Sequence, residues 1–312
     1  MTNNNHTILV ICGPTASGKT SLALSVAKHL SRANILSADS RQIYKDLGIV
    51  TGKDIPKNLS RSIKLFGLDL VNPDADFNVA SFTEYAQQII QSSLAENIPL
   101  IIVGGTGLYL QSITSSLLTA HVPPNQVLRD ELEKLTLPAL KTKLMEINSA
   151  KFISLNNSDA NNPRRLIRAI EISSSLNHSR GSVIPAKAGI HQVIHPTFHW
   201  IGLTQDKDKQ KEGILQRVKD RLKIGAIREV QKLREKYPNS SLPIFSSLGV
   251  EQIIDYQNQK ISLEELIDLW TTAENNYAKR QMVWFKKQSG IIWYDKSNLG
   301  DNLVTELAEL LK

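Results

Sequence analysis

The stretch "ILVICGPTASGKTSLALSVAKHL", residues 8–30, decides the fold. An apolar run ending at Cys12 leads into G-x-x-x-x-G-K-T, and a helical pattern follows, so the motif lies between a strand and a helix. Glycines there let the chain turn tightly, and backbone N–H groups can surround phosphate oxygens at the positive end of the helix. We therefore predict a diphosphate or triphosphate site, with Lys19 as a cation and the Thr20 hydroxyl as a Mg²⁺ ligand. The expected binding residues are Gly13, Pro14, Thr15, Ala16, Ser17, Gly18, Lys19 and Thr20.

Further apolar runs indicate a sheet around this first strand. With the run at 7–12, they predict strands at 34–38, 64–71, 99–103, 198–203 and 291–294. Helical patterns lie between most of them, at 20–30, 79–96, 207–233 and 262–287. Alternating strands and helices predict an α/β fold, with a mostly parallel sheet flanked by helices on both faces.

The alternation stops near residue 118, where the Pro-rich segment HVPPNQVL, residues 121–128, begins a different section. Helical patterns follow at 126–134, 137–147 and 164–175, the last with Asn162 as N-cap and Pro163 at the first helical position. No strand pattern appears before Phe198. We therefore expect a core of residues 1–120 and 198–312 and an all-helical insertion at 121–197, in which residues 179–196 form a flexible crossing.

Composition narrows the class of protein. The 312 residues carry a formal net charge of +7, an excess that suits a polyanionic partner such as nucleic acid or serves solubility alone. Cys12 is the only cysteine and lies in a predicted buried strand, so we expect an inert thiol and a reducing, cytoplasmic compartment. The chain begins without a secretion-signal pattern, and no window approaches the ~20 apolar residues of a membrane span.

The chemistry served by the loop depends on the acidic residues near it. A nucleotide hydrolase usually has a carboxylate at the end of a later strand, where it holds Mg²⁺ and aligns water. The best later strand here ends instead in Gly104, Gly105 and Thr106. The acidic residue near the loop is Asp39, at the end of the second predicted strand. It can act as a base on an incoming nucleophile, or merely cap the next turn.

Five segments in order carry a family resemblance: GPTASGKT at 13–20, SADSRQIYKDLGIVTGK at 37–53, VGGTGLYLQ at 103–111, NNPRRLIRAIEI at 161–172 and NYAKRQMVWFKK at 276–287. Together they resemble the tRNA dimethylallyltransferases, also called tRNA isopentenyltransferases, over nearly the whole chain. The resemblance implies a P-loop core of the nucleotide-kinase-like type and a helical insertion that grips the tRNA anticodon stem-loop. It also implies a monomeric enzyme that transfers a dimethylallyl group from dimethylallyl diphosphate to the exocyclic N6 amine of the adenosine 3′-adjacent to the anticodon.

The residues suit that reaction. An allylic carbon tolerates positive charge, so negative charge grows on the departing diphosphate, where the loop amides, Lys19 and Mg²⁺ at Thr20 can stabilise it. Thr15 could contact the bridging oxygen or the reacting carbon, and Asp39 can accept a proton from the attacking amine. Arg217 and Arg221 lie four residues apart on a basic helix; if one clamps the leaving group, we prefer Arg221.

The resemblance also implies two sets of tRNA contacts. The target base is held by Asp39 and Ser40, with Arg41 and Gln42 beside them and Thr106 closing the crevice. The insertion contacts tRNA through Arg129, Arg164, Arg165, Leu166, Ile167 and Arg168. In the C-terminal segment we expect Tyr277, Gln281, Trp284 and Phe285 to pack the core, while Lys279 and Arg280 reach tRNA or diphosphate.

Two places depart from the family pattern. The helix after Arg221 is shorter than usual, and SLGVEQI at 247–253 has Val250 and Glu251 where the family has a tyrosine and a basic residue, so we assign no tRNA contact there. His191, His195 and His199 are spaced four apart, but Pro196 interrupts any helix that would align them as metal ligands.

Two other functions remain open at this point. An ATP-dependent small-molecule kinase on the same fold would explain the loop and Asp39, although not the arginine-rich helix of the insertion. A non-catalytic RNA-binding protein that uses a nucleotide as a switch would need segments tied to a Mg²⁺-binding acid, and the sequence offers no candidate.

Overall fold

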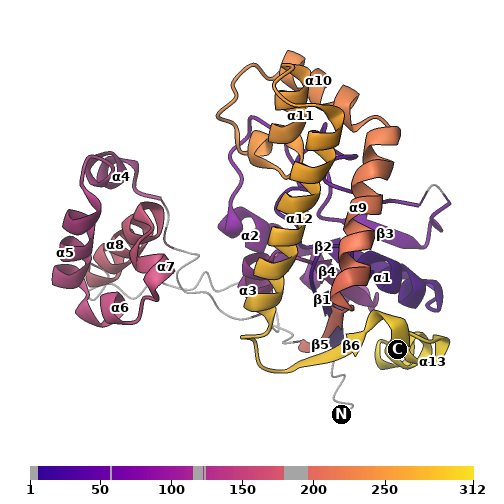
Figure 1. The fold of residues 1–312 in the computed structure, drawn as a ribbon. Coiled ribbons are helices and arrows are strands. Elements are labelled where there is room, and N and C mark those ends of the chain that lie inside the picture. The colour runs from indigo at the N-terminus through magenta and orange to yellow at the C-terminus, as the bar shows by residue number, and fades with distance from the viewer. Residues whose placement is uncertain (1–5, 57, 115–121, 123, 179–195) are drawn as a thin grey trace, which may run out of the picture. The chain divides into compact units, whose positions relative to one another are not determined.

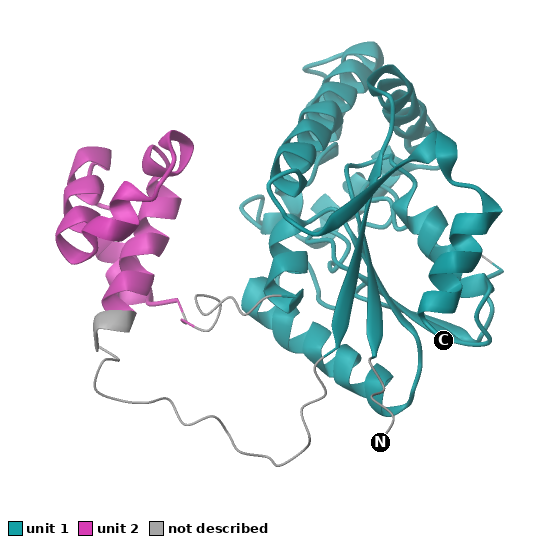
Figure 2. Cartoon of the chain, turned by 90° about the horizontal axis from the view of Figure 1, so that it is seen from below, with its two compact units in different colours: residues 1–115, 193–312 teal, residues 116–192 magenta. Residues whose placement is uncertain are grey.

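The structure is a computed structural model that describes residues 6–56, 58–114, 122, 124–178 and 196–312, with only the backbone of 176–178. The chain divides into two compact units, residues 1–115 with 193–312 and residues 116–192 (Figure 2). The expected crossing at 179–196 lies, except for its last residue, outside the described residues.

The larger unit is built on one parallel sheet (Figure 1). Its strands among the described residues are β1 (Thr7–Cys12), β2 (Ala33–Ser37), β3 (Ile63–Phe66), β4 (Leu100–Gly104), β5 (Thr197–Thr204) and β6 (Ile291–Asp295), in spatial order β3-β2-β4-β1-β5-β6. β1 pairs with β4 on one side and β5 on the other. Its continuous apolar run is therefore buried on both faces, as is typical of a central parallel strand. The prediction of an α/β fold with a parallel sheet is confirmed.

Helices cover both faces of this sheet. On the face to which Leu9 and Ile11 point, the core includes side chains of α1 (Lys19–Lys28) and α13 (Asp301–Leu310). Ile8, Val10 and Cys12 point to the opposite face, because successive strand residues alternate. The core on that face includes side chains of α2 (Val79–Ala95), α3 (Gly107–Thr114), α9 (Lys207–Lys223), α10 (Ala226–Lys236), α11 (Val250–Gln257) and α12 (Leu263–Phe285). Burial raises the pKa of the Cys12 thiol to about 12, which agrees with an inert side chain.

Two predicted elements are wrong in extent, and positive φ angles explain both. The helix expected at 207–233 is broken into α9 and α10 by Gly225, whose φ of 110° lies in the left-handed region. The strand expected at 64–71 ends at Phe66, because Gly67 and Asp69 have φ angles of 81° and 51°. Extended backbone cannot continue through such residues.

The smaller unit has a helical core of its own. Its helices are α4 (Gln126–Leu132), α5 (Leu137–Ile147), α6 (Ser149–Ile153), α7 (Asn157–Ala160) and α8 (Pro163–His178). Asn162 caps α8 as expected, since its side-chain oxygen accepts a hydrogen bond from Arg165 N at 3.3 Å. Leu166 and Ile170 of α8 are fully buried against Leu140 and Leu144 of α5. Across the described part of the chain, we find no helix with the length and apolar character that crossing a membrane requires.

Candidate active site

The predicted phosphate-binding loop joins β1 to α1, and its backbone has the wrapped shape that the glycines suggested. Gly13, Ala16 and Gly18 have φ angles of 140°, 63° and 89°. A Cβ on Gly13 would lie 2.5 Å from the Leu203 carbonyl oxygen of β5, so a side chain there would push the loop off the sheet. The fold thus places the loop at the carboxyl edge of the sheet, where ligands of open α/β folds bind.

Side chains from distant elements fix this loop from outside. Gln281 of α12 accepts a hydrogen bond from Thr15 N at 2.8 Å and donates one to the Gly105 carbonyl at 3.0 Å. Gln210 of α9 donates to the Thr15 carbonyl at 3.1 Å. The expectation that Gln281 packs the core is therefore incomplete, because its buried amide also ties the loop to the end of β4. Phe285, by contrast, is fully buried in the core.

Lys19 lies at the first position of α1, with its Nζ 2.5 Å from the Pro14 carbonyl oxygen of the loop. Desolvation and the positive charge of Arg217 lower the pKa of Lys19 to about 8, while Asp39 acts in the opposite direction. A cation that is destabilised in this way gains most when an anion arrives beside it. The loop is therefore poised for a phosphate group.

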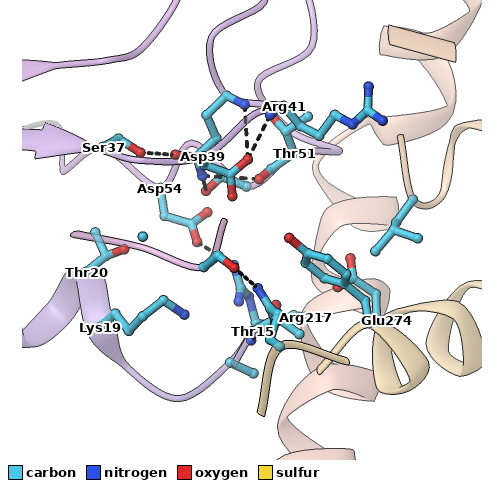
Figure 3. A pocket seen from close by; sticks show the side chains of 18 of the residues that line it. Thr15, Lys19, Thr20, Ser37, Asp39, Arg41, Thr51, Asp54, Arg217 and Glu274 are labelled. Carbon is cyan, nitrogen blue, oxygen red and sulfur yellow. Dashed lines mark hydrogen bonds and ion pairs between the residues drawn. The ribbon is translucent and has the colours of Figure 1, made fainter. Parts of the chain in front are cut away.

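A cavity of about 490 Å³ opens above the loop, entirely within the larger unit (Figure 3). Asp39 lies across it from Lys19. Of the residues that the sequence predicted, the cavity brings together Thr15, Ala16, Gly18, Lys19, Thr20, Asp39, Ser40, Arg41, Gln42, Arg217, Arg221, Tyr277, Arg280 and Gln281. Thr106 lies beside it, where its hydroxyl accepts a hydrogen bond from Ser40 N at 3.2 Å.

Asp39 caps a turn, and this leaves part of its carboxylate available. Its Oδ1 accepts hydrogen bonds from Arg41 N at 2.8 Å and from Gln42 N at 3.4 Å. No group among the described residues donates to its other oxygen. The two interpretations that the sequence left open are thus compatible, because the turn holds one oxygen and orients the other in the cavity.

Arg41 and Gln42 are engaged with the cavity wall. Arg41 donates to the Pro243 carbonyl at 2.5 Å and to Ser246 Oγ at 3.0 Å. The Gln42 amide accepts from Ser37 Oγ at 2.9 Å and donates to the Gly52 carbonyl at 3.0 Å. These side chains therefore organise the wall in the free protein. Residues 246–248 also line the cavity, so it includes the start of segment 247–253, to which the sequence assigned no tRNA contact.

The turn at 48–54 contributes part of the cavity wall, and Glu229 of α10 fixes the start of this turn. Its carboxylate accepts hydrogen bonds from Gly48 N, Ile49 N and Val50 N at 2.7, 2.8 and 2.8 Å. Three charge-assisted bonds to consecutive amides hold this turn tightly against α10. Glu229 was missed by sequence reasoning because no local pattern links it to residues 180 positions away.

Arg217 and Arg221 of α9 both enter the cavity through the gap left by Gly52. A Cβ on Gly52 would lie 3.0 Å from Arg217 Nη2 and 2.2 Å from Arg221 Nη2. Their partners differ. Arg217 pairs at 3.0 Å with Asp54, whose side chain is 68% exposed, whereas Arg221 pairs at 3.1 Å with Glu274, and both of those side chains are 9% exposed.

Tyr277 of α12 lines the same cavity as Arg217 and Arg221. Burial raises the pKa of its hydroxyl to about 12, and the negative charge of Asp39 is the second cause of this shift. Arg280 lies 5.7 Å from the Tyr277 ring in a cation–π contact and also lines the cavity. The ring and the guanidinium offer planar surfaces of the kind on which an RNA base can stack.

In the smaller unit, the predicted tRNA-contacting residues separate into two groups. Leu166 and Ile167 are 0% and 7% exposed and pack its core, and their expected contact with tRNA stays a prediction. Arg164 and Arg165 are exposed, and Arg165 pairs with Asp159.

Arg129 and Arg168 share one buried carboxylate, that of Glu171 in α8. Glu171 accepts two hydrogen bonds from Arg129 at 3.0 Å, another from Arg168, and one from Asn125 N at 2.6 Å. Burial opposes ionisation of Glu171, but the hydrogen bonds to Arg129, Asn125 and Arg168 outweigh it and lower the pKa of this carboxyl. Both arginines remain about one-third exposed, at 31% and 32%.

The described residues offer no cluster of metal-ligating side chains. Within the described ranges, no three His, Cys, Asp or Glu side chains gather in a way that could hold a metal ion. Of the three histidines spaced four apart, His199 lies in β5, while His191 and His195 fall outside the described residues, so the expectation that they hold no metal stays a prediction. The exposed Thr20 hydroxyl at the cavity fits a Mg²⁺ ion that takes its other ligands from phosphate oxygens and water.

Comparison with known proteins decides the family. The model of the IPP transferase family matches residues 42–288. The chain belongs to this family. A tRNA dimethylallyltransferase of Prochlorococcus marinus strain AS9601 is 33% identical over 311 residues, which cover 100% of both chains. One of Finegoldia magna is 38% identical over 286 residues, which cover 91% of this chain and 90% of the other. A solved tRNA isopentenylpyrophosphate transferase of Bacillus halodurans, at 27% identity and a TM-score of 0.69, covers 98% of this chain and 95% of its own.

Proposed function

We propose that this member of the IPP transferase family transfers a dimethylallyl group from dimethylallyl diphosphate to the exocyclic N6 amine of the adenosine 3′-adjacent to the anticodon of tRNA, and releases diphosphate. One observation carries the proposal: a phosphate-binding loop with Lys19 faces Asp39 across a single cavity, without an acidic residue at the end of β4. Relatives named tRNA dimethylallyltransferase that match end to end support it.

The loop stabilises the leaving group. As the allylic carbon–oxygen bond breaks, negative charge grows on the diphosphate. The loop amides and Lys19 are already oriented to stabilise that charge. Mg²⁺ at Thr20 would neutralise part of the same charge. Thr15 lies in the loop at the cavity, where its hydroxyl can contact the bridging oxygen.

Asp39 receives the proton of the attacking amine. Its capped oxygen fixes the carboxylate, and the other oxygen accepts the N6 proton as the new carbon–nitrogen bond forms. Ser40 and Thr106, joined by their hydrogen bond, form the adjoining wall for the adenine ring. Tyr277 and Arg280, which form a cation–π pair, line the same cavity. They can stack on a base that has left the anticodon stack.

We assign the clamp on the leaving group to Arg217 rather than to the Arg221 preferred from sequence. The pair of Arg217 with exposed Asp54 is readily exchanged for a pair with phosphate. Removing Arg221 from Glu274 would instead leave a buried carboxylate without its partner, which is costly. Arg221 therefore acts as a fixed part of the wall.

The helical unit, residues 116–192, supplies a basic surface for the tRNA. Arg164 and Arg165 are exposed, and Glu171 holds Arg129 and Arg168 in fixed orientations. Guanidinium groups that are fixed in this way suit phosphate oxygens or stacked bases. A single-chain enzyme in the cytoplasm remains our expectation.

Transfer of label tests the function. Purified protein is incubated with bulk tRNA and either labelled dimethylallyl diphosphate or labelled ATP. We expect label in RNA only from the first donor, on adenosine in nucleoside mass analysis. Transfer of phosphate from ATP to a small acceptor, with no prenylated nucleoside, would instead establish the kinase alternative.

A further inference from the structure

Lys296 lies beside the phosphate-binding loop but comes from the other end of the chain. β6 ends at Asp295, and residues Lys296–Asn298 form a 3₁₀ turn before α13. Asp295 fixes this turn, since its Oδ1 accepts hydrogen bonds from Ser297 N at 2.8 Å and Ser297 Oγ at 2.5 Å. Because β6 runs parallel to β5 and β1, its end lies at the same edge of the sheet as the loop.

The Lys296 side chain contacts the loop at two points. Its methylene carbons lie 3.4–3.9 Å from the position that a Cβ on Gly18 would take, so the stem crosses the loop where this glycine has no side chain. Its Nζ lies 3.4 Å from the Ala16 carbonyl oxygen. Lys296 also lines the cavity together with Lys19 and Thr20, which places its ammonium group at the rim.

The charges around the cavity distinguish Lys296 from the arginines. Arg217 and Arg221 each pair with a carboxylate, those of Asp54 and Glu274. Among the residues that the structure describes, no carboxylate forms an ion pair with Lys296, whose side chain is exposed. The hydrogen bond from its Nζ to the Ala16 carbonyl is long, and the acceptor is neutral, so a phosphate oxygen is a stronger partner.

We propose that Lys296 is a further diphosphate-binding residue, whose ammonium group moves from the Ala16 carbonyl to a phosphate oxygen of the bound prenyl donor. This inference rests on the proposed function, because that function supplies the ligand. The contact involves a phosphate charge that is present before and after the carbon–oxygen bond breaks. The growing charge develops first on the bridging oxygen, so a contact with another phosphate oxygen binds the ground state nearly as well as the transition state, and its loss affects the donor KM more than kcat.

Two substitutions separate charge from packing. Lys296→Met keeps the apolar stem across Gly18 but removes the charge, whereas Lys296→Arg keeps the charge. Binding of inorganic diphosphate and of dimethylallyl diphosphate, with Mg²⁺, is measured by calorimetry on the full chain. We expect Lys296→Met to weaken both by roughly fivefold, with the deficit shrinking at high salt, and Lys296→Arg to bind almost as the wild type does. The donor KM rises by the same factor, and kcat stays within about twofold.

The control is Lys312→Met, because Lys312 is exposed and pairs with Glu309 at the end of the chain. Its diphosphate affinity is expected to be unchanged. Wild-type affinity in Lys296→Met, or an equal loss in Lys296→Arg, would overturn the assignment. A wild-type chain that binds inorganic diphosphate yet prenylates no tRNA would overturn the proposed function instead. In that case the affinities for inorganic diphosphate would still test whether Lys296 binds it.

Discussion

Asp39 combines two roles that one substitution can separate. Asparagine keeps an oxygen that can accept the hydrogen bond from Arg41 N, so Asp39→Asn preserves the turn but removes the base. We expect near-normal diphosphate binding and turnover at least ~10²-fold lower, the usual scale for loss of a general base. Single-turnover transfer to tRNA measures the loss. Wild-type turnover would remove Asp39 from the chemistry.

Lys19 predicts a pH dependence of anion binding. Its lowered pKa of about 8 means that the free protein carries this charge below pH 8 and loses it above. A bound diphosphate favours the charged form, so affinity is full below pH 8 and falls as the pH rises through it. Titration of the diphosphate itself affects both proteins equally, so it cancels in the ratio of the Lys19→Met Kd to the wild-type Kd. We expect this ratio to be largest below pH 8 and to decline above; a constant ratio would contradict the assignment.

At the scale of elements, the cavity depends on how closely the turn at 48–54 approaches α9. Gly52→Ala places a Cβ where the two arginine side chains now lie, and adds the strain of a φ of 67°. We expect turnover to fall at least tenfold, because the Arg221 guanidinium group must move by about an ångström and that of Arg217 by a smaller amount, and a displacement of about an ångström disrupts well-oriented sites.

Gly290→Ala is the matched control for that substitution. Gly290 has a φ of 82°, so it adds similar backbone strain, but nothing lies within 4 Å of its Cβ position. Its unfolding free energy is expected to fall as in Gly52→Ala, while its turnover stays near the wild-type rate. Equal turnover in the two variants would show that strain, and not displacement of the arginines, controls activity.

At the scale of the whole molecule, we expect the larger unit to bind the donor and the helical unit to contribute to tRNA binding. Arg164→Ala in the helical unit removes an exposed charge without disturbing the buried Glu171 network. We expect weaker tRNA binding and a slope of log affinity against log salt reduced by about one ion, with diphosphate affinity and kcat at saturating tRNA unchanged. A filter-binding titration over several salt concentrations tests this, and an unchanged slope would contradict a phosphate contact.

The sequence predicts well whatever is local. The loop, the strand that precedes it and the N-cap at Asn162 are short patterns, and the structure contains all three. Sequence reasoning failed where one glycine interrupts a periodic helix, as at Gly225, and where function depends on contacts across the fold. Glu229, Asp54 and Lys296 carry no motif, because their roles arise only when the fold brings distant segments together. Glu229 of α10 holds the 48–54 turn, and that turn and the end of β6 both reach the cavity.

The burial of Cys12 in β1 makes the chain a convenient starting point for spectroscopy. Its thiol has 0% exposed surface and a pKa raised to about 12, so it presents almost no thiolate to maleimide or methanethiosulfonate reagents near neutral pH. Cysteines introduced at exposed positions, such as Arg164 in one unit and Lys312 in the other, would then be the reactive thiols to label. One probe on each unit would allow the distance between them to be followed as donor and tRNA bind, without first removing a native thiol.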